Sequence, residues 1–146
     1  MAVVRNDPLG SFNFIVEIPN VARAGFSEVF GLGLEVQVIE YREGNDAALS
    51  VRKLVGLVKY NNIVLKRGLT ADHSLWDWAR QAVQGNVQRV DVSITLLNDQ
   101  RQPVVRWIAR NAWVSKYEGP TLNAKAKDVA MESVEIAHEG IELVVV

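Results

Sequence analysis

Few residues in this sequence could support catalysis, and those few lie far apart. The two histidines, His73 and His138, are accompanied by no Gly-x-Ser-x-Gly nucleophile motif and no His-Glu-x-x-His metalloprotease motif. His73 and Asp77 would lie one turn apart on a helix and could offer a metal ion two ligands, but a solvated helix start explains the pair better. We therefore predict no catalytic residue, no metal site and no enzymatic activity.

Cofactor and redox chemistry also lack support. The chain has no cysteine, which excludes a disulfide framework, a thiol nucleophile and a thiolate zinc site. Gly31 and Gly33 have the spacing that opens a dinucleotide-binding motif, but that motif requires glycine or alanine where Val36 stands. We expect no bound cofactor.

The charged residues nearly balance. There are 16 Lys plus Arg and 17 Asp plus Glu, which gives a formal net charge of −1. Without a global positive field, nucleic-acid binding would need a local basic patch, and the pairs Arg52-Lys53 and Lys66-Arg67 lack aromatic residues for base stacking. We predict ordinary surface charge at both pairs and no specific nucleic-acid binding. A solvated strand face is expected to hold the late acidic residues: Glu132, Glu135, Glu139 and Glu142.

Aromatic residues and cations lie side by side in one region. Trp107, Trp113 and Tyr117 are interspersed with cations that include Arg110 and Lys116. Tryptophan, tyrosine and arginine are enriched at the energetic centres of protein interfaces. Composition leaves two interpretations open: an interface with another chain, or core aromatic residues flanked by solvated cations.

The elements that would position these residues are mainly strands, because apolar and polar residues alternate along much of the chain. Strands are expected in these ranges: 12–18, 26–30, 34–42, 62–67, 90–96, 105–114 and 129–143. Residues 43–50 have neither helix nor strand period and predict a long loop, which leads into a mixed basic and apolar segment at 52–58. Two strands or a long hairpin would suit 52–58 together with 62–67. With 146 residues, the chain is expected to form a single domain, 1–146.

One helix is predicted. Thr70 or Asp72 could cap its N-terminus, and Gly85 suits the left-handed position that follows a helix C-terminus. Its apolar stripe consists of Leu75, Trp78, Ala79, Ala82 and Val83. Seven or eight strands and one helix indicate a mainly β fold, a β-barrel or β-sandwich of antiparallel strands with one flanking α-helix, and argue against a parallel α/β fold.

Neither end of the chain suggests a membrane or secretory segment. The first ten residues have no apolar core and include Arg5 and Asp7, so we expect no signal peptide. No stretch approaches the ~20 apolar residues of a membrane helix. We expect a soluble protein with no membrane segment, made in the cytoplasm.

Several motifs resemble, in order, those of the tail tube proteins, which build the inner tubes of contractile-tailed phages and phage-tail-like contractile injection systems. The resemblance covers residues 7–142 and rests on these segments: Asp7-Pro8-Leu9-Gly10-Ser11-Phe12-Asn13-Phe14, Gly25-Phe26-Ser27-Glu28-Val29, Val38-Ile39-Glu40-Tyr41-Arg42-Glu43-Gly44, Val51-Arg52-Lys53-Leu54, Asn62-Ile63-Val64-Leu65-Lys66-Arg67-Gly68, Leu75-Trp76-Asp77-Trp78, Arg110-Asn111-Ala112-Trp113, Glu118-Gly119-Pro120 and Ala137-His138-Glu139-Gly140. The chain departs from the family where proline is frequent, at Val55 and Val114, and where tryptophan is frequent, at Tyr117.

The resemblance implies a tail-tube-like structural protein whose hexameric rings stack into a hollow inner tube. Its implied partners are further copies of itself, a sheath protein around the tube, baseplate or hub and tail-terminator proteins at the ends, and cargo in the lumen, either effector proteins or DNA. A contracting sheath would drive the tube through a target envelope. Such a protein is made in the bacterial cytoplasm and becomes part of a phage tail or a phage-tail-like particle, which some systems release. Both a main tube subunit and a baseplate-proximal ring fit these motifs.

The resemblance also implies three stacking elements: residues 5–10, an extended inter-ring loop at about 43–59, and the chain from about residue 138. Because the loop's cations have no obvious partner within the chain, we hypothesise that Arg42, Arg52 and Lys53 meet Glu139 or Glu142 of the adjacent ring. The residues expected at ring-stacking and inter-subunit contacts are Asp7, Pro8, Leu9, Arg42, Glu43, Arg52, Lys53, Leu54, Trp113, Lys116, Tyr117, Glu139 and Glu142.

Two other functions compete with this one. A monomeric ligand-binding β-barrel would need an apolar interior cavity, for which tryptophans are common wall residues. A hydrolytic enzyme would need an assembled nucleophile, base or metal set, which the sequence does not provide.

Overall fold

The computed structural model describes residues 7–146, with the backbone alone at residues 22–24. Arg5, which the resemblance assigns to ring stacking, lies outside the described residues. Within them the chain forms ten strands and one helix: β1 (Phe14–Ile18), β2 (Ala22–Ala24), β3 (Glu28–Phe30), β4 (Leu34–Tyr41), β5 (Arg52–Tyr60), β6 (Ile63–Gly68), α1 (Ser74–Val83), β7 (Val90–Leu97), β8 (Pro103–Glu118), β9 (Met131–Ala137) and β10 (Gly140–Val145). The predicted mainly β fold of antiparallel strands with one flanking helix is confirmed.

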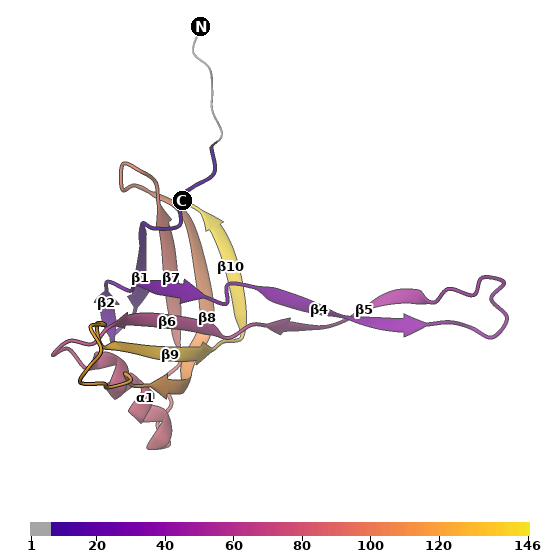
Figure 1. Cartoon of the computed structure of the whole chain (residues 1–146). Helices are drawn as coiled ribbons and strands as arrows, with labels where there is room; N and C mark the ends of the chain where they lie inside the picture. Colours follow the sequence, from indigo (N-terminus) through magenta and orange to yellow (C-terminus); the bar gives the residue numbers. More distant parts are fainter. Residues whose placement is uncertain (1–6) are drawn as a thin grey trace, which may run out of the picture.

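Strand β8 organises the sheet. The strand order is β2-β1-β7-β8-β9-β6-β3, and β10 also pairs with β8. The first half of β8 lies between β7 and β10, and its second half pairs with β9. The change of partners occurs near Asn111, whose φ of 53° lies in the left-handed region that asparagine tolerates better than most residues. In Figure 1 the sheet therefore folds over itself, so that β6 and β9 cross β7 and β8.

The hydrophobic core lies between these two parts of the sheet. Val16 and Ile94 face it from the first part, Leu65 and Ile136 from the second, and Trp78 from α1. All five side chains are buried. Each strand contributes every second residue, as the sequence alternation predicts.

Helix α1 ends just before Gly85, as predicted, but neither Thr70 nor Asp72 is its N-cap residue, which is His73. The carboxylate of Asp72 accepts a hydrogen bond from the Ser74 amide at 3.1 Å, and Gly85 has a φ of +74°. Amides after the C-terminus donate back to Ala82 and Gln81, which satisfies two helix carbonyls. Among residues 7–146 no helix is long and apolar enough to span a membrane.

The predicted apolar stripe of α1 is wrong at its end. Val83 is 87% exposed, whereas Gln81, which lies outside the stripe, is partly buried. The Gln81 side-chain oxygen has no hydrogen-bond partner. The reason is length: the last turn of the helix extends past the sheet, so its apolar residues are not covered by the chain's own core.

The predicted extended loop at about 43–59 is a β-hairpin instead. Strands β4 and β5 form their own two-stranded sheet, and residues 42–51 alone form the connecting loop. Val36 pairs with Val58 but Val38 pairs with Val55, so β5 contains a bulge at Gly56. A Cβ at Gly56 would lie 2.8 Å from the Gln37 carbonyl oxygen. The expectation of strands within 52–67 is confirmed by β5 and β6, but a hairpin between these two segments is wrong, because β5 pairs with β4 and β6 pairs with β3 and β9. The bulge breaks the two-residue period of β5.

Candidate assembly interface

The β4–β5 hairpin stands away from the rest of the molecule (Figure 1). Its register runs from Leu34 opposite Tyr60 at the base to Tyr41 opposite Arg52 near the tip. Every residue of β4 is exposed, and so are most residues of β5. An isolated two-stranded hairpin is at best marginally stable in water, so this one requires a packing partner outside its own chain.

The hairpin carries apolar side chains that the described part of the chain, residues 7–146, leaves exposed. Directly opposed residues share a face, so Val36, Val38, Val55 and Val58 form one exposed valine cluster. Val55 alone is 83% exposed. The exposed apolar residues of the hairpin are Leu34, Val36, Val38, Ile39, Tyr41, Leu54, Val55, Leu57 and Val58. Contiguous exposed apolar surface of this kind marks an interaction site.

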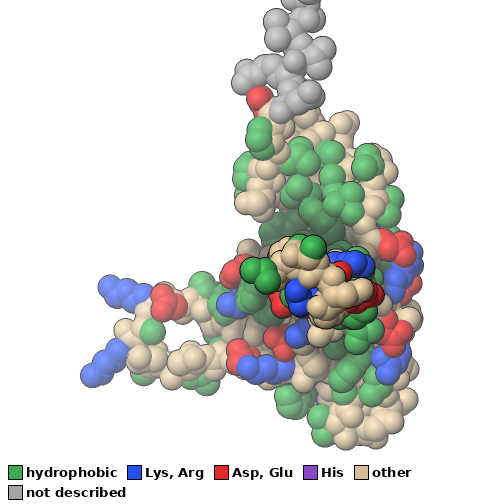
Figure 2. Space-filling model, turned by 90° about the vertical axis from the view of Figure 1, so that its right-hand side faces the viewer, with side chains coloured by type: hydrophobic (Ala, Val, Ile, Leu, Met, Phe, Trp, Pro, Cys, Tyr) green, Lys and Arg blue, Asp and Glu red, His purple; other side chains and the backbone are tan. Residues whose placement is uncertain are grey.

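The hairpin tip carries charges of both signs, and it points toward the viewer in Figure 2. Arg42 donates to the carbonyl oxygens of Asp46 and Ala48, each at 3.0 Å. Arg52 Nη2 lies 3.4 Å from the Asp46 carboxylate. The expectation that these two arginines lack partners in their own chain is therefore wrong. Among the described residues Lys53 makes no ion pair, and it lies opposite Glu40.

Two other predicted tip residues are placed differently. Glu43 accepts a hydrogen bond from the Tyr41 hydroxyl at 3.0 Å, which fixes both side chains beside the loop. Leu54 is exposed on the face of β5 opposite the valine cluster, directly across from Ile39. Leu54 is therefore available to a neighbouring molecule, whereas Glu43 is partly engaged.

Glu139 and Glu142 belong to a charged network where β8 changes partners. Arg110 lies 2.9 Å from the Asp91 carboxylate and 3.1 Å from that of Glu142. Asn111 donates its side-chain amide to Glu139, which also lies 3.4 Å from Arg89. The motifs Arg110-Asn111 and Glu139-Gly140 thus meet in space: the Glu139 amide also donates to the Arg110 carbonyl oxygen.

The electrostatics of this network follow from its hydrogen bonds. The Asn111 backbone amide, and after it Arg110, lower the pKa of the Asp91 carboxyl. Glu142 and Asp91 in turn raise the pKa of Arg110. All these groups are solvated, so the network sets the shape of the strand junction more than it stabilises the fold.

A buried ion pair contradicts two surface predictions. Arg67 Nε donates to Glu132 Oε1 at 2.6 Å, and the Tyr117 hydroxyl donates to the other Glu132 oxygen at 2.7 Å. Arg67 is 4% and Glu132 1% exposed. Sequence reasoning placed both on solvated faces. The sequence pattern could have indicated the burial of Arg67, because every second residue of β6 faces the core and Arg67 continues the series Ile63 and Leu65.

Trp113, Lys116 and Tyr117 come together at the second half of β8. The Arg89 guanidinium lies over the Trp113 ring, 5.9 Å from its centroid. Lys116 is exposed and lies 2.9 Å from the Glu118 carboxylate. Burial, and then the hydrogen bond to Glu132, raise the pKa of Tyr117 to about 12. The region is thus part core and part surface: Tyr117 is partly buried beside Glu132, whereas Lys116 is exposed. The interpretation as an interface with another chain stays a prediction.

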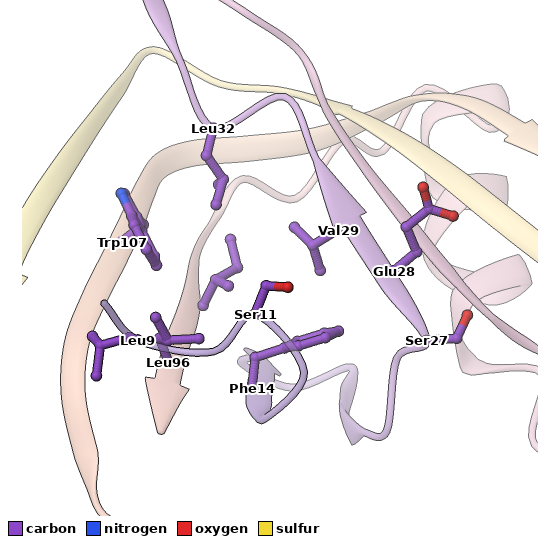
Figure 3. Close-up of a pocket in the computed structure, with 10 residues that line it drawn as sticks. Leu9, Ser11, Phe14, Ser27, Glu28, Val29, Leu32, Leu96 and Trp107 are labelled. Atoms are coloured by element: carbon purple, nitrogen blue, oxygen red, sulfur yellow. The ribbon is translucent and has the colours of Figure 1, made fainter. Parts of the chain in front are cut away.

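Asp7, Pro8 and Leu9 are exposed at the beginning of the described chain. Leu9 lies at the edge of an apolar cavity of about 410 Å³ between the two parts of the sheet. Figure 3 shows Leu9, Phe14 and Trp107 around this space, with Glu28 near its rim. This cavity is the feature that a ligand-binding barrel would need.

Both histidines contact neighbouring groups of the fold. The two nitrogens of the His138 ring lie 2.9 Å from the Asn61 carbonyl oxygen and 3.1 Å from that of Gly140. His73 lies 3.4 Å from Asp77 in an exposed pair. In the part of the chain that the structure describes, no group of three or more metal-ligating residues comes together.

Comparison with known families identifies the fold and its role. The chain matches the family model of the T4-like virus tail tube protein gp19 over residues 10–142. The chain belongs to this tail tube family. Its resemblance to tail tube proteins is thereby confirmed over nearly the whole domain, and the hairpin and the β8 junction are features of a tail tube subunit.

Solved structures support the same assignment. A chain of the PVC sheath-tube complex of an extracellular contractile injection system is 26% identical, with 95% of this chain and 93% of that chain covered and a TM-score of 0.86. The tube-terminating cap of the anti-feeding prophage is 23% identical over 100% and 97%, with a TM-score of 0.88. Hcp1 from Flavobacterium johnsoniae is 14% identical over 90% and 94%, with a TM-score of 0.58. No relative was found among curated protein sequences.

This tail tube protein is thus a structural component of a phage tail or contractile injection particle. Its family and structural neighbours are structural tube proteins, which agrees with a non-enzymatic role. The family assignment displaces the monomeric ligand-binding barrel, even though the apolar cavity is present.

Proposed function

We propose that copies of this tail tube protein close into hexameric rings and that the rings stack into a hollow tube. The observation that carries the proposal is the β4–β5 hairpin, which exposes apolar side chains on both strands and pairs with no other strand of residues 7–146. A structural neighbour belongs to a sheath-tube complex, and another to a six-fold symmetrised baseplate.

Ring closure would use the sheet edges. Among the described residues, β10 pairs only with β8, β3 only with β6, and β2 only with β1. Each therefore offers an edge whose backbone groups are free to pair with a neighbouring copy. Pairing around a closed ring satisfies those groups and removes edges that would otherwise promote aggregation.

Ring stacking would use the hairpin and the segment at residues 7–9. Burial of the valine cluster and Leu54 supplies the apolar contact, and Lys53 is the tip cation that remains to pair with Glu139 or Glu142 of the next ring. One exposed pair contributes only ~0.2–1 kcal/mol, but a ring repeats it. The ion pair of Lys53 would therefore orient the hairpin, and burial of its apolar side chains would supply most of the binding free energy.

The assembled tube would lie inside a contractile sheath, end at baseplate and terminator proteins, and carry effector proteins or DNA in its lumen. The sheath and terminator partners follow from the complexes in which the structural neighbours occur. Both a main tube subunit and a baseplate-proximal ring use these same surfaces.

Sedimentation velocity of the purified protein tests the proposal. The wild type should form large, concentration-dependent assemblies, and the double variant Val36→Ser/Val38→Ser should form nothing larger than a single ring of folded subunits. Leu122→Ser is the matched control, because Leu122 is equally apolar and 81% exposed but lies outside the hairpin. A wild type that stays monomeric at high concentration contradicts the proposal.

A further inference from the structure

A second apolar surface lies between α1 and β8. It is a groove with a volume of about 550 Å³, lined by Trp76, Ala79, Arg80, Ala82, Val83, Trp113, Val114, Ser115, Lys116 and Tyr117. Trp76 stands edge-on to Tyr117 with ring centroids 5.2 Å apart. The uncovered last turn of α1 thus forms one wall, and β8 forms the other.

The β8 wall is the edge of a strand. Successive strand residues point to opposite faces of a sheet, so five consecutive residues, 113–117, can line one groove only where the strand presents its edge. Strand β9 pairs with the other edge of this half of β8. Pairing with β7 ends at Ala112, and no other strand of the described residues takes its place. Backbone donors and acceptors are therefore available along the groove.

The charged side chains that line the groove are positive. Arg80 and Lys116 are its only charged lining residues, and both are cations. Within the described residues Arg80 makes no ion pair, and Lys116 shares its charge with Glu118. Apolar surface lies between the two cations, since Trp76 is 48% and Val83 87% exposed. Tryptophan beside arginine is the composition of an interface centre.

We propose that this groove binds an extended, acidic segment of another protein, which adds a strand to the open edge of β8. Its backbone would pair with residues 113–117, its bulky apolar side chains would cover Trp76 and Val83, and its carboxylates would meet Arg80 and Lys116. Strand addition of this kind combines backbone affinity with side-chain specificity. We assign the groove to another protein because the proposed contacts between copies use other surfaces: the edges of β2, β3 and β10 for ring closure, and the hairpin and residues 7–9 for stacking. The groove lies beside α1, away from the hairpin (Figure 1).

A peptide-binding experiment on the full-length protein tests the proposal. The probe is a short synthetic peptide in which glutamate alternates with valine and leucine, and binding is measured by calorimetry. The wild type should bind it saturably. Arg80→Glu/Lys116→Glu should weaken binding by about tenfold or more, the effect of losing charge-assisted contacts. Lys125→Glu, a charge reversal on an exposed lysine outside the groove, should leave binding unchanged.

Two further arms separate the alternatives. The same peptide with N-methylated backbone amides should lose binding, because it cannot pair with β8. Equal binding by the methylated peptide, or no effect of the charge reversals, overturns the proposal. Loss of self-assembly in Arg80→Glu/Lys116→Glu also overturns it, because the groove would then be a contact between copies. Peptide binding does not require ring formation, so failure of the proposed tube would leave this result intact.

Discussion

Arg67 of β6 and Glu132 of β9 form a buried ion pair, with Nε and Oε1 2.6 Å apart. Around this pair, the Tyr117 hydroxyl of β8 donates to Glu132, and Arg67 donates to the Asp72 carbonyl oxygen at 2.9 Å. The Asp72 carboxylate accepts a hydrogen bond from the Ser74 amide at the start of α1. One charge pair therefore joins three strands to the start of the helix, and so holds one wall of the groove in place.

Removing one member of this pair should strongly destabilise the fold. Glu132→Gln leaves the buried Arg67 with only the exposed Asp72 carboxylate, 3.5 Å from its Nη1, as a counter-charge. The expected cost is up to about 3–5 kcal/mol. Urea unfolding followed by circular dichroism measures the loss. The double variant Arg67→Leu/Glu132→Leu removes both charges and should be less destabilised than Glu132→Gln. A loss under about 1 kcal/mol for Glu132→Gln would show that the pair is solvated.

Tyr117 should make stability depend on pH in the alkaline range. Its pKa is raised to about 12 in the folded protein, whereas an unfolded tyrosine titrates near 10. Its stabilising effect is therefore complete below pH 10 and is lost as the pH rises toward 12. Tyr117→Phe should cost about 1.5–3 kcal/mol at neutral pH, because it removes a hydrogen bond to a carboxylate.

The measurement is the unfolding free energy of wild type and Tyr117→Phe from pH 9 to 12. The difference between the two proteins should shrink across that range, which separates Tyr117 from other alkaline titrations common to both. A constant difference would contradict the role assigned to its hydroxyl.

Charge reversal at the hairpin tip should impair assembly without unfolding the subunit. Arg52→Glu/Lys53→Glu breaks the contact of Arg52 with Asp46 and reverses the free charge of Lys53. Tubes should be shorter or absent in electron micrographs, and the midpoint of thermal unfolding should change little because both residues are exposed. Lys125→Glu/Lys127→Glu makes the same charge change outside the hairpin. Tubes of wild-type length in the first variant would sink the hypothesis.

Gly85→Ala should weaken the end of α1. At a φ of +74° an alanine is strained by about 1–2 kcal/mol, whereas glycine is not. Gly44→Ala is the matched control, because Gly44 has no atom within 4 Å of an added Cβ and no positive φ. Thermal unfolding of both variants checks this, and equal midpoints would contradict the assigned helix end.

The sequence predicted what depends on local period. Alternation located β1, β6 and β7, and the signals at Asp72 and Gly85 located α1 within a residue or two. The single strand expected at 129–143 is wrong, because the chain turns between β9 and β10, which pair with different halves of β8. The same alternation indicates that Glu132 is buried, because Glu132 shares a face of β9 with Val134 and Ile136. The prediction nevertheless placed Glu132 in solvent, because burying an isolated carboxylate costs too much free energy. Its partner Arg67 lies on another strand and could not be identified from the sequence.

Features that require contacts between several strands could not be predicted from the sequence. The bulge at Gly56 removed the period of β5, and the partners of Arg42 lie within its own loop. Glu139 and Glu142 meet Arg89 and Arg110 only because β8 changes neighbours near Asn111. The groove beside α1 arises from an unpaired strand edge, which no single segment encodes.

Cryo-electron microscopy of the purified wild-type protein tests the central claim most directly. The account predicts rings with six-fold symmetry, stacked into hollow tubes, in which the valine cluster of each β4–β5 hairpin is buried against a neighbouring copy. A monodisperse monomer at high concentration, or a tube in which the hairpin remains exposed to solvent, would contradict it.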